Sequence, residues 1–366
     1  MTKHNANNER IKRQYFIYLR NAKQQSLKAV DGAASALARF EKHTKYRDIK
    51  LFRSELAIAF KRHLAEQVSQ KSGESLSKAT MYATLTSIKS FFQWLSRETG
   101  YKSRIHYSDA EYFNMSAKDA RVATTRREKV APTLEQVKHV ISIMPSDTAI
   151  ERRNRALIAF TLLTGARDGA IASMKLKHID LPGNKVYQDA RDVNTKFSKT
   201  FFTFFFPVGD EVRQIVAEWV AYLKEELLWG NDDPLFPATR MEQNAAFQFE
   251  AVGLERAHWS NATPIRKIFR DAFISAGLPY FNPHCFRDTL TQHGIVTCQN
   301  NAESLKAWSQ NLGHEKVLTT LLNYGQVATH RQGEIMQALA RPQQATQPNV
   351  SELAKAIAHE LRATSL

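Results

Sequence analysis

The sequence has little of what exported or membrane proteins carry. It contains only two cysteines, Cys285 and Cys298, which are too few for a disulfide framework and are not spaced as thiolate ligands of zinc. Its longest apolar runs, such as IAFTLLTGA and FFTFFFPV, are too short to cross a bilayer. The first residues, MTKHNANNERIKRQ, lack the apolar core of a signal peptide. We therefore expect a cytoplasmic protein with no membrane partner.

Several common catalytic motifs are absent as well. The sequence has no Walker lysine loop, no dinucleotide-binding glycine fingerprint, no HExxH motif and no nucleophile elbow. Its acidic run NDDP, at 231–234, is typical of a turn rather than of a metal site. These absences argue against a metal-dependent nuclease, and we expect no bound metal.

The chain does carry a large and unevenly distributed positive charge. Residues 1–130 contain 26 of the 51 lysines and arginines but only 12 of the 36 aspartates and glutamates, a balance of +14, whereas the other 236 residues have a balance of +1. A merely soluble basic surface is the simpler interpretation. The uneven distribution favours a polyanion as partner, and nucleic acid over an anionic membrane, because no strongly amphipathic basic helix is visible.

A length of 366 residues predicts two domains, and a hydrophobic content of 43% predicts that both are folded. We expect a basic arm over 1–24, a helical DNA-binding domain over 25–120, a linker over 121–131, a second domain over 132–340 and a tail helix over 341–366. Apolar spacing places helices in the first domain at 27–40 and from a cap at Ser77 to a stop at Gly100.

The second domain is predicted to be mostly helical with one small sheet. Thr133 and Gln136 form the pattern of a capping box at its first helix. Helical spacing covers 133–144, 150–164, 210–228, 263–276, 286–297 and the chain from 303, with a short helix after Arg167 and strands within 184–190 and 199–208. The tail helix has a narrow apolar stripe, which either its own domain or a neighbouring subunit must cover.

Five polar residues of this second domain lie at helix ends or on helix faces. Arg167 follows Gly165 in LLTGARDGA, His284 and Arg287 are three apart in FNPHCFRDTL, and His314 and Tyr324 lie in NLGHEKVLTTLLNYGQV. Each by itself is more often a cap, a surface residue or a packed tyrosine than a catalytic group.

Taken in chain order, these residues resemble the tyrosine recombinases, also called the phage integrase family. The matching elements, over roughly residues 133–330, are TGAR, a lysine in a β-hairpin, HxxR, LGH and the final tyrosine. The helical domain before them resembles the core-binding domain of that family in placement and character. The resemblance implies a mainly α fold with a small antiparallel β-sheet, in which a helical core-binding domain precedes a tyrosine-recombinase catalytic domain.

Three features depart from the usual pattern of that family. Asp168 directly follows the first arginine, and Ala170 occupies the position where an acidic residue is common. Asp288 follows the second arginine, where many members carry a histidine. His314 and Tyr324 are ten residues apart, one more than the common interval.

The resemblance implies how strand cleavage would proceed. Tyr324 would attack phosphorus and form a covalent 3′-phosphotyrosyl intermediate with a free 5′ hydroxyl. Lys196, with Lys199 as the alternative, would protonate the departing 5′ oxygen from a mobile hairpin. His284 would act near the tyrosine as a base or as a hydrogen-bond donor.

The remaining residues of the pattern would bind the phosphate. Arg167, Arg287 and His314 would stabilise the charge on its nonbridging oxygens, because planar guanidinium groups match that geometry. The resemblance implies that no cofactor is required. It also implies a homotetramer acting on two sites in double-stranded DNA, and accessory DNA-bending proteins are a further partner class that the sequence leaves open.

The predicted function is thus a site-specific DNA recombinase or integrase of a mobile genetic element. One alternative is a DNA-binding protein of the same fold without catalysis, and another is a resolvase of chromosome dimers. The complete set of five residue types argues against the first alternative, and the basic N-terminal segment favours a mobile element over the second.

Overall fold

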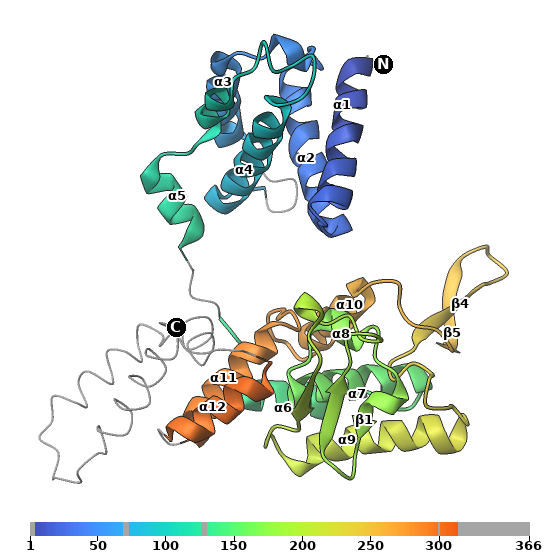
Figure 1. Ribbon diagram of the computed structural model, residues 1–366. Coiled ribbons are helices and arrows are strands. Elements are labelled where there is room, and N and C mark those ends of the chain that lie inside the picture. The colour runs from blue at the N-terminus through green and yellow to red at the C-terminus, as the bar shows by residue number, and fades with distance from the viewer. Residues whose placement is uncertain (1–3, 69–72, 126–129, 299–300, 314–366) are drawn as a thin grey trace, which may run out of the picture. The chain divides into compact units, whose positions relative to one another are not determined.

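The computed structural model describes residues 4–68, 73–125, 130–298 and 301–313, with the side chain of residue 197 left out. The chain divides into two compact units, Met1–Arg127 and Glu128–Leu366, here called the helical unit and the C-terminal unit (Figure 1). None of the helices in the described residues is long and apolar enough to cross a membrane.

The described part of the helical unit is built from helices around an aromatic core. Its main helices are α1 (Ala6–Ile17), α2 (Leu27–His43), α3 (Ser54–Glu66), α4 (Lys78–Leu95) and α5 (Ala117–Thr124), with a π-helical turn, η1 (Tyr18–Ala22), and 3-10 helices η2 (Ile49–Leu51) and η3 (Tyr107–Phe113). The predicted cap is present, since Ser77 Oγ accepts a hydrogen bond of 3.2 Å from the Thr80 amide. Phe40 contacts Phe60, Phe92 and Phe113 at the centre of the core.

The prediction of a loose arm over 1–24 is wrong for residues 6–22. Ile11, Tyr15 and Leu19 recur every four residues and are buried in the core of the helical unit, so the segment folds as α1 and η1. Its positive charge is partly neutralised there, because Lys12 pairs with the buried Glu41 of α2. The predicted linker is shorter than 121–131, since α5 extends to Thr124.

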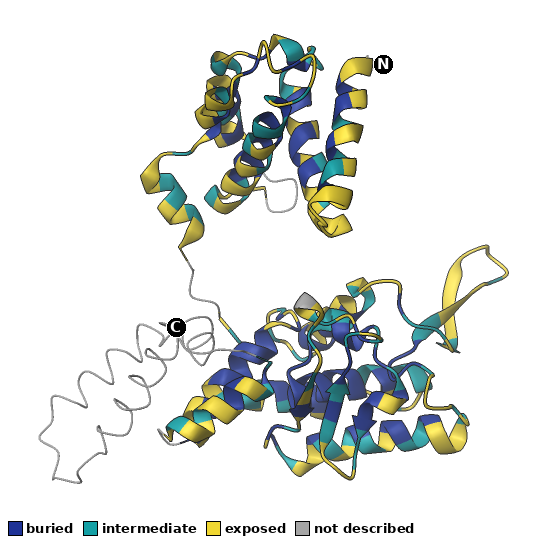
Figure 2. Cartoon of the chain, in the orientation of Figure 1, coloured by how far each residue is buried: buried dark blue, intermediate teal, exposed yellow. Residues whose placement is uncertain are grey.

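The C-terminal unit surrounds a long buried helix, α7 (Ala149–Thr164), whose last nine residues are all buried (Figure 2). The other helices that the structure describes are α6 (Leu134–Ile143), α8 (Asp168–Ile171), α9 (Asp210–Ala221), which continues as a π-helical turn, η6 (Tyr222–Glu226), α10 (Thr263–Ser275), α11 (Cys285–Thr297) and α12 (Ala302–Asn311). The capping box at the first helix is confirmed by hydrogen bonds of 2.9 and 3.1 Å between Thr133 and Gln136.

The unit has two small antiparallel sheets where one was predicted. The predicted sheet has the order β1 (Ile179–Asp180), β2 (Lys185–Gln188) and β3 (Phe201–Phe204), with Val186 opposite Thr203. The second is a hairpin of β4 (Ala238–Gln243) and β5 (Phe249–Glu255), which extends away from the rest of the unit in Figure 1. Most of its residues are exposed, so it lacks the alternation of apolar and polar residues that marks a half-buried strand.

Candidate active site

The segment that carries the first candidate arginine turns sharply at Gly165. This glycine ends α7 with a φ of +60°, and a Cβ there would lie 3.0 Å from Leu312 and 3.1 Å from Leu290. Only glycine therefore satisfies both the left-handed backbone and the tight packing. Arg167, two residues on, is the N-cap residue of α8 and is partly exposed. Within the described chain its guanidinium has no hydrogen bond or ion pair.

The second candidate pair lies at the start of α11. The Asn282 side chain accepts a hydrogen bond of 3.0 Å from the His284 amide and shapes the turn into the helix. His284 is exposed, whereas Arg287, one turn later, is only 3% exposed. The two side chains therefore differ in exposure.

The Arg287 guanidinium joins three segments that are distant in the sequence. Nη1 donates a hydrogen bond of 2.7 Å to the carbonyl of Gly165, and Nη2 donates to the carbonyl of Leu312. Gly165 belongs to TGAR and Leu312 to LGH, so one buried side chain of HxxR links the three predicted motifs. Hydrogen bonds from a charged donor to buried carbonyls make this a strong link.

The end of α12 is fixed against β3. The Asn311 side chain accepts a hydrogen bond of 2.6 Å from the Phe204 amide and donates one of 2.8 Å to the Phe204 carbonyl, as a neighbouring strand would. Gly313, with a φ of +73°, lies against the ring of Phe201, which a Cβ would approach to 2.8 Å. The turn that leads to His314 is therefore held on the strand that follows the candidate lysines.

Both candidate lysines lie in the connection between β2 and β3. Lys196 begins a 3-10 turn, η5 (Lys196–Ser198), and is exposed, while Lys199 is partly exposed. Thr200 closes the connection, since its Oγ1 accepts a hydrogen bond of 3.0 Å from the Ala190 amide. The lysines are thus carried by a loop that is pinned at its base.

The acidic residues that depart from the family pattern have different surroundings. Asp168 accepts two contacts of 2.7 Å from the guanidinium of Arg266 on α10, so it ties α10 to the helix that follows Arg167. Asp288 is buried on α11 next to Arg287.

Two of the candidate residues, His314 and Tyr324, lie outside the described residues, as does the predicted tail helix over 341–366. The structure therefore brings together the segment of Arg167, the side chain of Arg287, the lysine-bearing hairpin and the turn before His314. The positions of the third phosphate ligand and of the nucleophile remain predictions.

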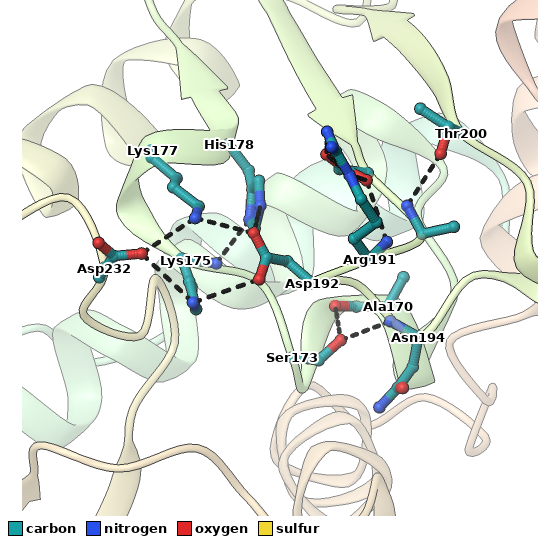
Figure 3. Close-up of polar contacts among 12 residues, drawn as sticks. Ala170, Ser173, Lys175, Lys177, His178, Arg191, Asp192, Asn194, Thr200 and Asp232 are labelled. Atoms are coloured by element: carbon teal, nitrogen blue, oxygen red, sulfur yellow. Dashed lines mark hydrogen bonds and ion pairs between the residues drawn. The ribbon is translucent and has the colours of Figure 1, made fainter.

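A cluster of charges that the sequence does not predict lies beside the lysine loop. Lys175 and Lys177, at the start of the 3-10 helix η4 (Leu176–His178), bind both Asp192 and Asp232 (Figure 3). Asp232 belongs to the NDDP segment, which forms a turn as predicted. The hydrogen bond from Lys177 holds the pKa of Asp192 below its usual range, and burial lowers the pKa of His178. Single charged residues in loops carry no signal that identifies such partners in advance.

Cys285 and Cys298 are both buried, and neither forms a disulfide within the described residues. Within the part of the chain that the structure describes, no three His, Cys, Asp or Glu side chains are grouped so that they could hold a metal ion.

Comparison with known proteins identifies the family. Residues 133–331, more than half of the chain, match the model of the phage integrase family. The chain belongs to the phage integrase family. The matched region contains TGAR, the lysine hairpin, HxxR, LGH and the final tyrosine, so the family predicted from these motifs is confirmed, as is the mainly α fold.

Several tyrosine recombinases are similar to this integrase-family chain over most of their length. It is 25% identical over 264 residues to tyrosine recombinase XerC of Lactobacillus delbrueckii subsp. bulgaricus, covering 70% of this chain and 74% of the relative. It is 22% identical over 320 residues to XerC of Halalkalibacterium halodurans, covering 86% and 91%. XerD of Proteus mirabilis is 25% identical over 261 residues, covering 69% and 70%.

Solved structures of the family share the fold. The XerH site-specific recombinase bound to its palindromic difH substrate matches with a TM-score of 0.58 at 17% identity, covering 90% of this chain and 84% of that one. A lambda integrase dimer bound to a COC′ core site matches with a TM-score of 0.57 at 13% identity, covering 85% and 93%.

Proposed function

We propose that this member of the phage integrase family is an active site-specific DNA recombinase that cuts and rejoins DNA through a 3′-phosphotyrosyl intermediate. The observation that carries the proposal is the bridge made by Arg287 between the carbonyls of Gly165 and Leu312. This bridge holds the segments of TGAR and LGH together, which is the arrangement that phosphate binding by Arg167, Arg287 and His314 requires.

In the proposed cleavage step, the Tyr324 oxygen attacks phosphorus as the bond to the 5′ oxygen breaks. The phenolic proton passes to a base, the role proposed for His284, and the 5′ oxygen takes a proton from the lysine. Arg167 has no described partner that would compete with a phosphate. The Arg287 guanidinium is a planar fork of N–H donors that holds two carbonyls, and we propose that it also donates to a phosphate oxygen.

These groups supply positive charge and proton transfer from the protein itself, so the proposed reaction uses no metal and no cofactor. A single preorganised donor to a developing charge is typically worth about 2.7 to 4 kcal/mol of transition-state stabilisation. Rejoining is the reverse step, in which a 5′ hydroxyl of the partner DNA attacks the phosphotyrosine.

The helical unit offers a surface for DNA. A groove between α2 and α4 is lined by the exposed basic residues Lys23, Arg39 and Arg97 together with small and hydroxyl-bearing side chains such as Ser35 and Thr86. Such a surface provides hydrogen-bond donors for phosphates, and its small side chains allow the DNA backbone to approach closely. The XerH and lambda integrase structures named above are DNA complexes, and the lambda integrase is a dimer on its site.

By extension, we propose a homotetramer on two double-stranded DNA sites in the cytoplasm, with accessory DNA-bending proteins as further partners. A mobile genetic element is the proposed origin. Chromosome-dimer resolution is the second candidate function, favoured by the XerC and XerD relatives, which share 22 to 25% identity with this chain.

The test is covalent capture. The purified full chain is incubated in EDTA with fragmented genomic DNA of its source, and denaturation-resistant protein–DNA adducts are isolated and sequenced. We expect an adduct at the 3′ end of one recurring sequence, and none with Tyr324→Phe. Recovery of a site at the border of an inserted element supports integration, whereas a single chromosomal site supports dimer resolution. Binding of DNA without any adduct would refute the enzymatic proposal.

A further inference from the structure

The charge cluster that the sequence does not predict is built on the loop that carries Lys196. This Asp192 cluster consists of Asp192, its neighbours Lys175, Lys177 and His178, and Asp232, which binds the same two lysines (Figure 3). The lysines and His178 come from the turn that enters the three-stranded sheet, Asp232 comes from the NDDP turn, and Asp192 alone comes from the segment between β2 and Lys196.

Asp192 has contacts on both carboxylate oxygens. Oδ1 lies 3.4 Å from Lys175 Nζ, and Oδ2 lies 2.8 Å from Lys177 Nζ and 3.6 Å from His178 Nε2. The ring of His178 is fixed, since its Nδ1 accepts a hydrogen bond of 2.9 Å from the Lys175 amide. In the neutral ring the proton is therefore on Nε2, which faces Asp192. The two lysine ammonium groups thus bind the carboxylate, whereas His178 Nε2 faces it at longer range without a hydrogen bond.

The residues that follow Asp192 are attached to the helix of the first candidate arginine. Val193 is buried, and the Asn194 amide donates a hydrogen bond of 2.8 Å to Ser173 Oγ. Ser173 Oγ in turn donates to the carbonyl of Ala170 on α8, at 3.1 Å. Lys196 lies two residues after Asn194, whereas Lys199 lies five residues after it. The Asn194 attachment therefore acts on the backbone near Lys196, whereas Lys199 lies next to the other attachment of the loop, the hydrogen bond from the Ala190 amide to Thr200.

We propose that Asp192 is a positioning residue for strand cleavage, which anchors the stem of the lysine loop on Lys175 and Lys177, beside His178, and thereby sets the reach of Lys196 toward the departing 5′ oxygen. The inference rests on the proposed function and assigns the proton transfer to Lys196. Asp192 itself touches neither phosphate nor leaving group.

The physical reason lies in the flexibility of lysine. Its ammonium group is carried by a flexible chain of four carbons. The lysine can therefore donate a proton at hydrogen-bonding distance only if the backbone that carries it is fixed. Misplacement of a catalytic group by about 1 Å can cost about 100-fold in rate. Loss of Asp192 would also leave Lys175 and Lys177 with Asp232 as their shared carboxylate partner in the cluster.

A first experiment tests the anchor without DNA. Hydrogen exchange of the full chain is compared for the wild type, Asp192→Ala and Asp232→Asn. Asp232 is the matched control, because it binds the same two lysines but belongs to a turn that does not carry Lys196. We expect Asp192→Ala to speed exchange of the amides of 192–196 at least 10-fold, with little change in α9, and Asp232→Asn to leave them unchanged. Unchanged exchange in Asp192→Ala would overturn the anchor.

A second experiment tests the link to proton transfer. Cleavage is measured on a synthetic duplex of the site recovered by adduct capture, with either oxygen or sulfur as the 5′ bridging atom of the cleaved phosphate. A thiolate leaves without a proton, so a defect in proton donation disappears with sulfur, whereas a general defect in folding or DNA binding persists. Arg167→Ala serves as the variant that sulfur should not rescue.

On the oxygen duplex we expect Asp192→Asn to slow cleavage by roughly 10- to 100-fold and Lys196→Ala by more, and both to recover on the sulfur duplex. Asp232→Asn should cleave both duplexes at nearly the wild-type rate. The inference would be overturned if Asp192→Asn cleaved the oxygen duplex normally, or if its defect persisted on the sulfur duplex. It would also be overturned if sulfur rescued Lys199→Ala and did not rescue Lys196→Ala. Failure of the wild type to cleave either duplex would instead refute the proposed function.

Discussion

Arg287 has a structural role that the fold shows and a second role, phosphate binding, that belongs to the proposed function. Its guanidinium is buried and holds the carbonyls of Gly165 and Leu312, yet the proposed chemistry also requires it to meet a phosphate. The two observed hydrogen bonds already require a planar fork of donors at this position. A lysine there would keep the charge but has one nitrogen, which cannot reproduce two separated bonds in the same geometry.

We predict that Arg287→Lys lowers the free energy of unfolding of the C-terminal unit by about 1 to 3 kcal/mol, the cost of leaving a buried carbonyl without its donor. Urea unfolding of the full chain measures the change. His284→Ala, at an exposed position three residues earlier, is the control and should alter stability by less than about 0.5 kcal/mol. Equal stability of Arg287→Lys and the wild type would mean that the bridge does not hold the motifs together.

The helix α1 shows how one element depends on a buried tyrosine in its last turn. The ring centroid of Tyr15 lies 5.0 Å from the ring centroids of both Phe91 and Trp94 of α4, and the residue is 2% exposed. Burial raises the pKa of the Tyr15 hydroxyl to about 12, from an ordinary value of about 10. The fold thus favours the neutral side chain, and this contribution to stability is complete below pH 10 and lost as the pH rises to 12.

We therefore predict that the helical unit loses about 2 to 3 kcal/mol of stability between about pH 10 and pH 12 through Tyr15. The measurement is urea unfolding of residues 1–127, produced as a separate fragment, at a series of alkaline pH values. Tyr15→Phe has no proton to lose at this position and should show a shallower decline. If the two proteins decline in parallel, other groups govern the alkaline unfolding.

In the whole molecule, the positive charge and the family motifs are divided between the two units. The balance of +14 lies in residues 1–130, whereas the region that matches the phage integrase family begins at residue 133. Affinity for any duplex should therefore come mainly from the helical unit, with a steep dependence on salt, because each neutralised phosphate releases counterions.

We predict that the fragment 1–127 binds a random-sequence duplex more tightly than the fragment 128–366 does, and with the steeper salt dependence.

In the full chain, Arg39→Gln combined with Arg97→Gln should reduce the slope of log affinity against log salt by about 2, one for each phosphate contact. Fluorescence anisotropy across a salt series measures both effects. Arg104→Gln, an exposed position that does not line the groove, is the control. An unchanged slope in the double variant would exclude the groove as the phosphate-binding surface.

The local features of this protein were predictable because they depend on neighbours in the chain. Capping at Ser77 and Thr133, the stop at Gly165 and the positions of α7 and β3 follow from residues within one or two helical turns. The family followed from the order of short motifs, which is also a property of the chain alone. The prediction of a loose N-terminal arm is wrong because it follows the many charges of the segment and not Ile11, Tyr15 and Leu19, the apolar residues that recur every four positions.

The arrangement of the candidate site was decided by the tertiary structure. Nothing adjacent to Arg287 in the sequence indicates that its donors reach Gly165, 122 positions away, and Leu312, 25 positions away. The same holds for Asp192 and for Asn311, whose partners come from other elements. Motifs therefore name the residue types that chemistry needs, whereas the packing of distant segments decides which side chains hold one another in place.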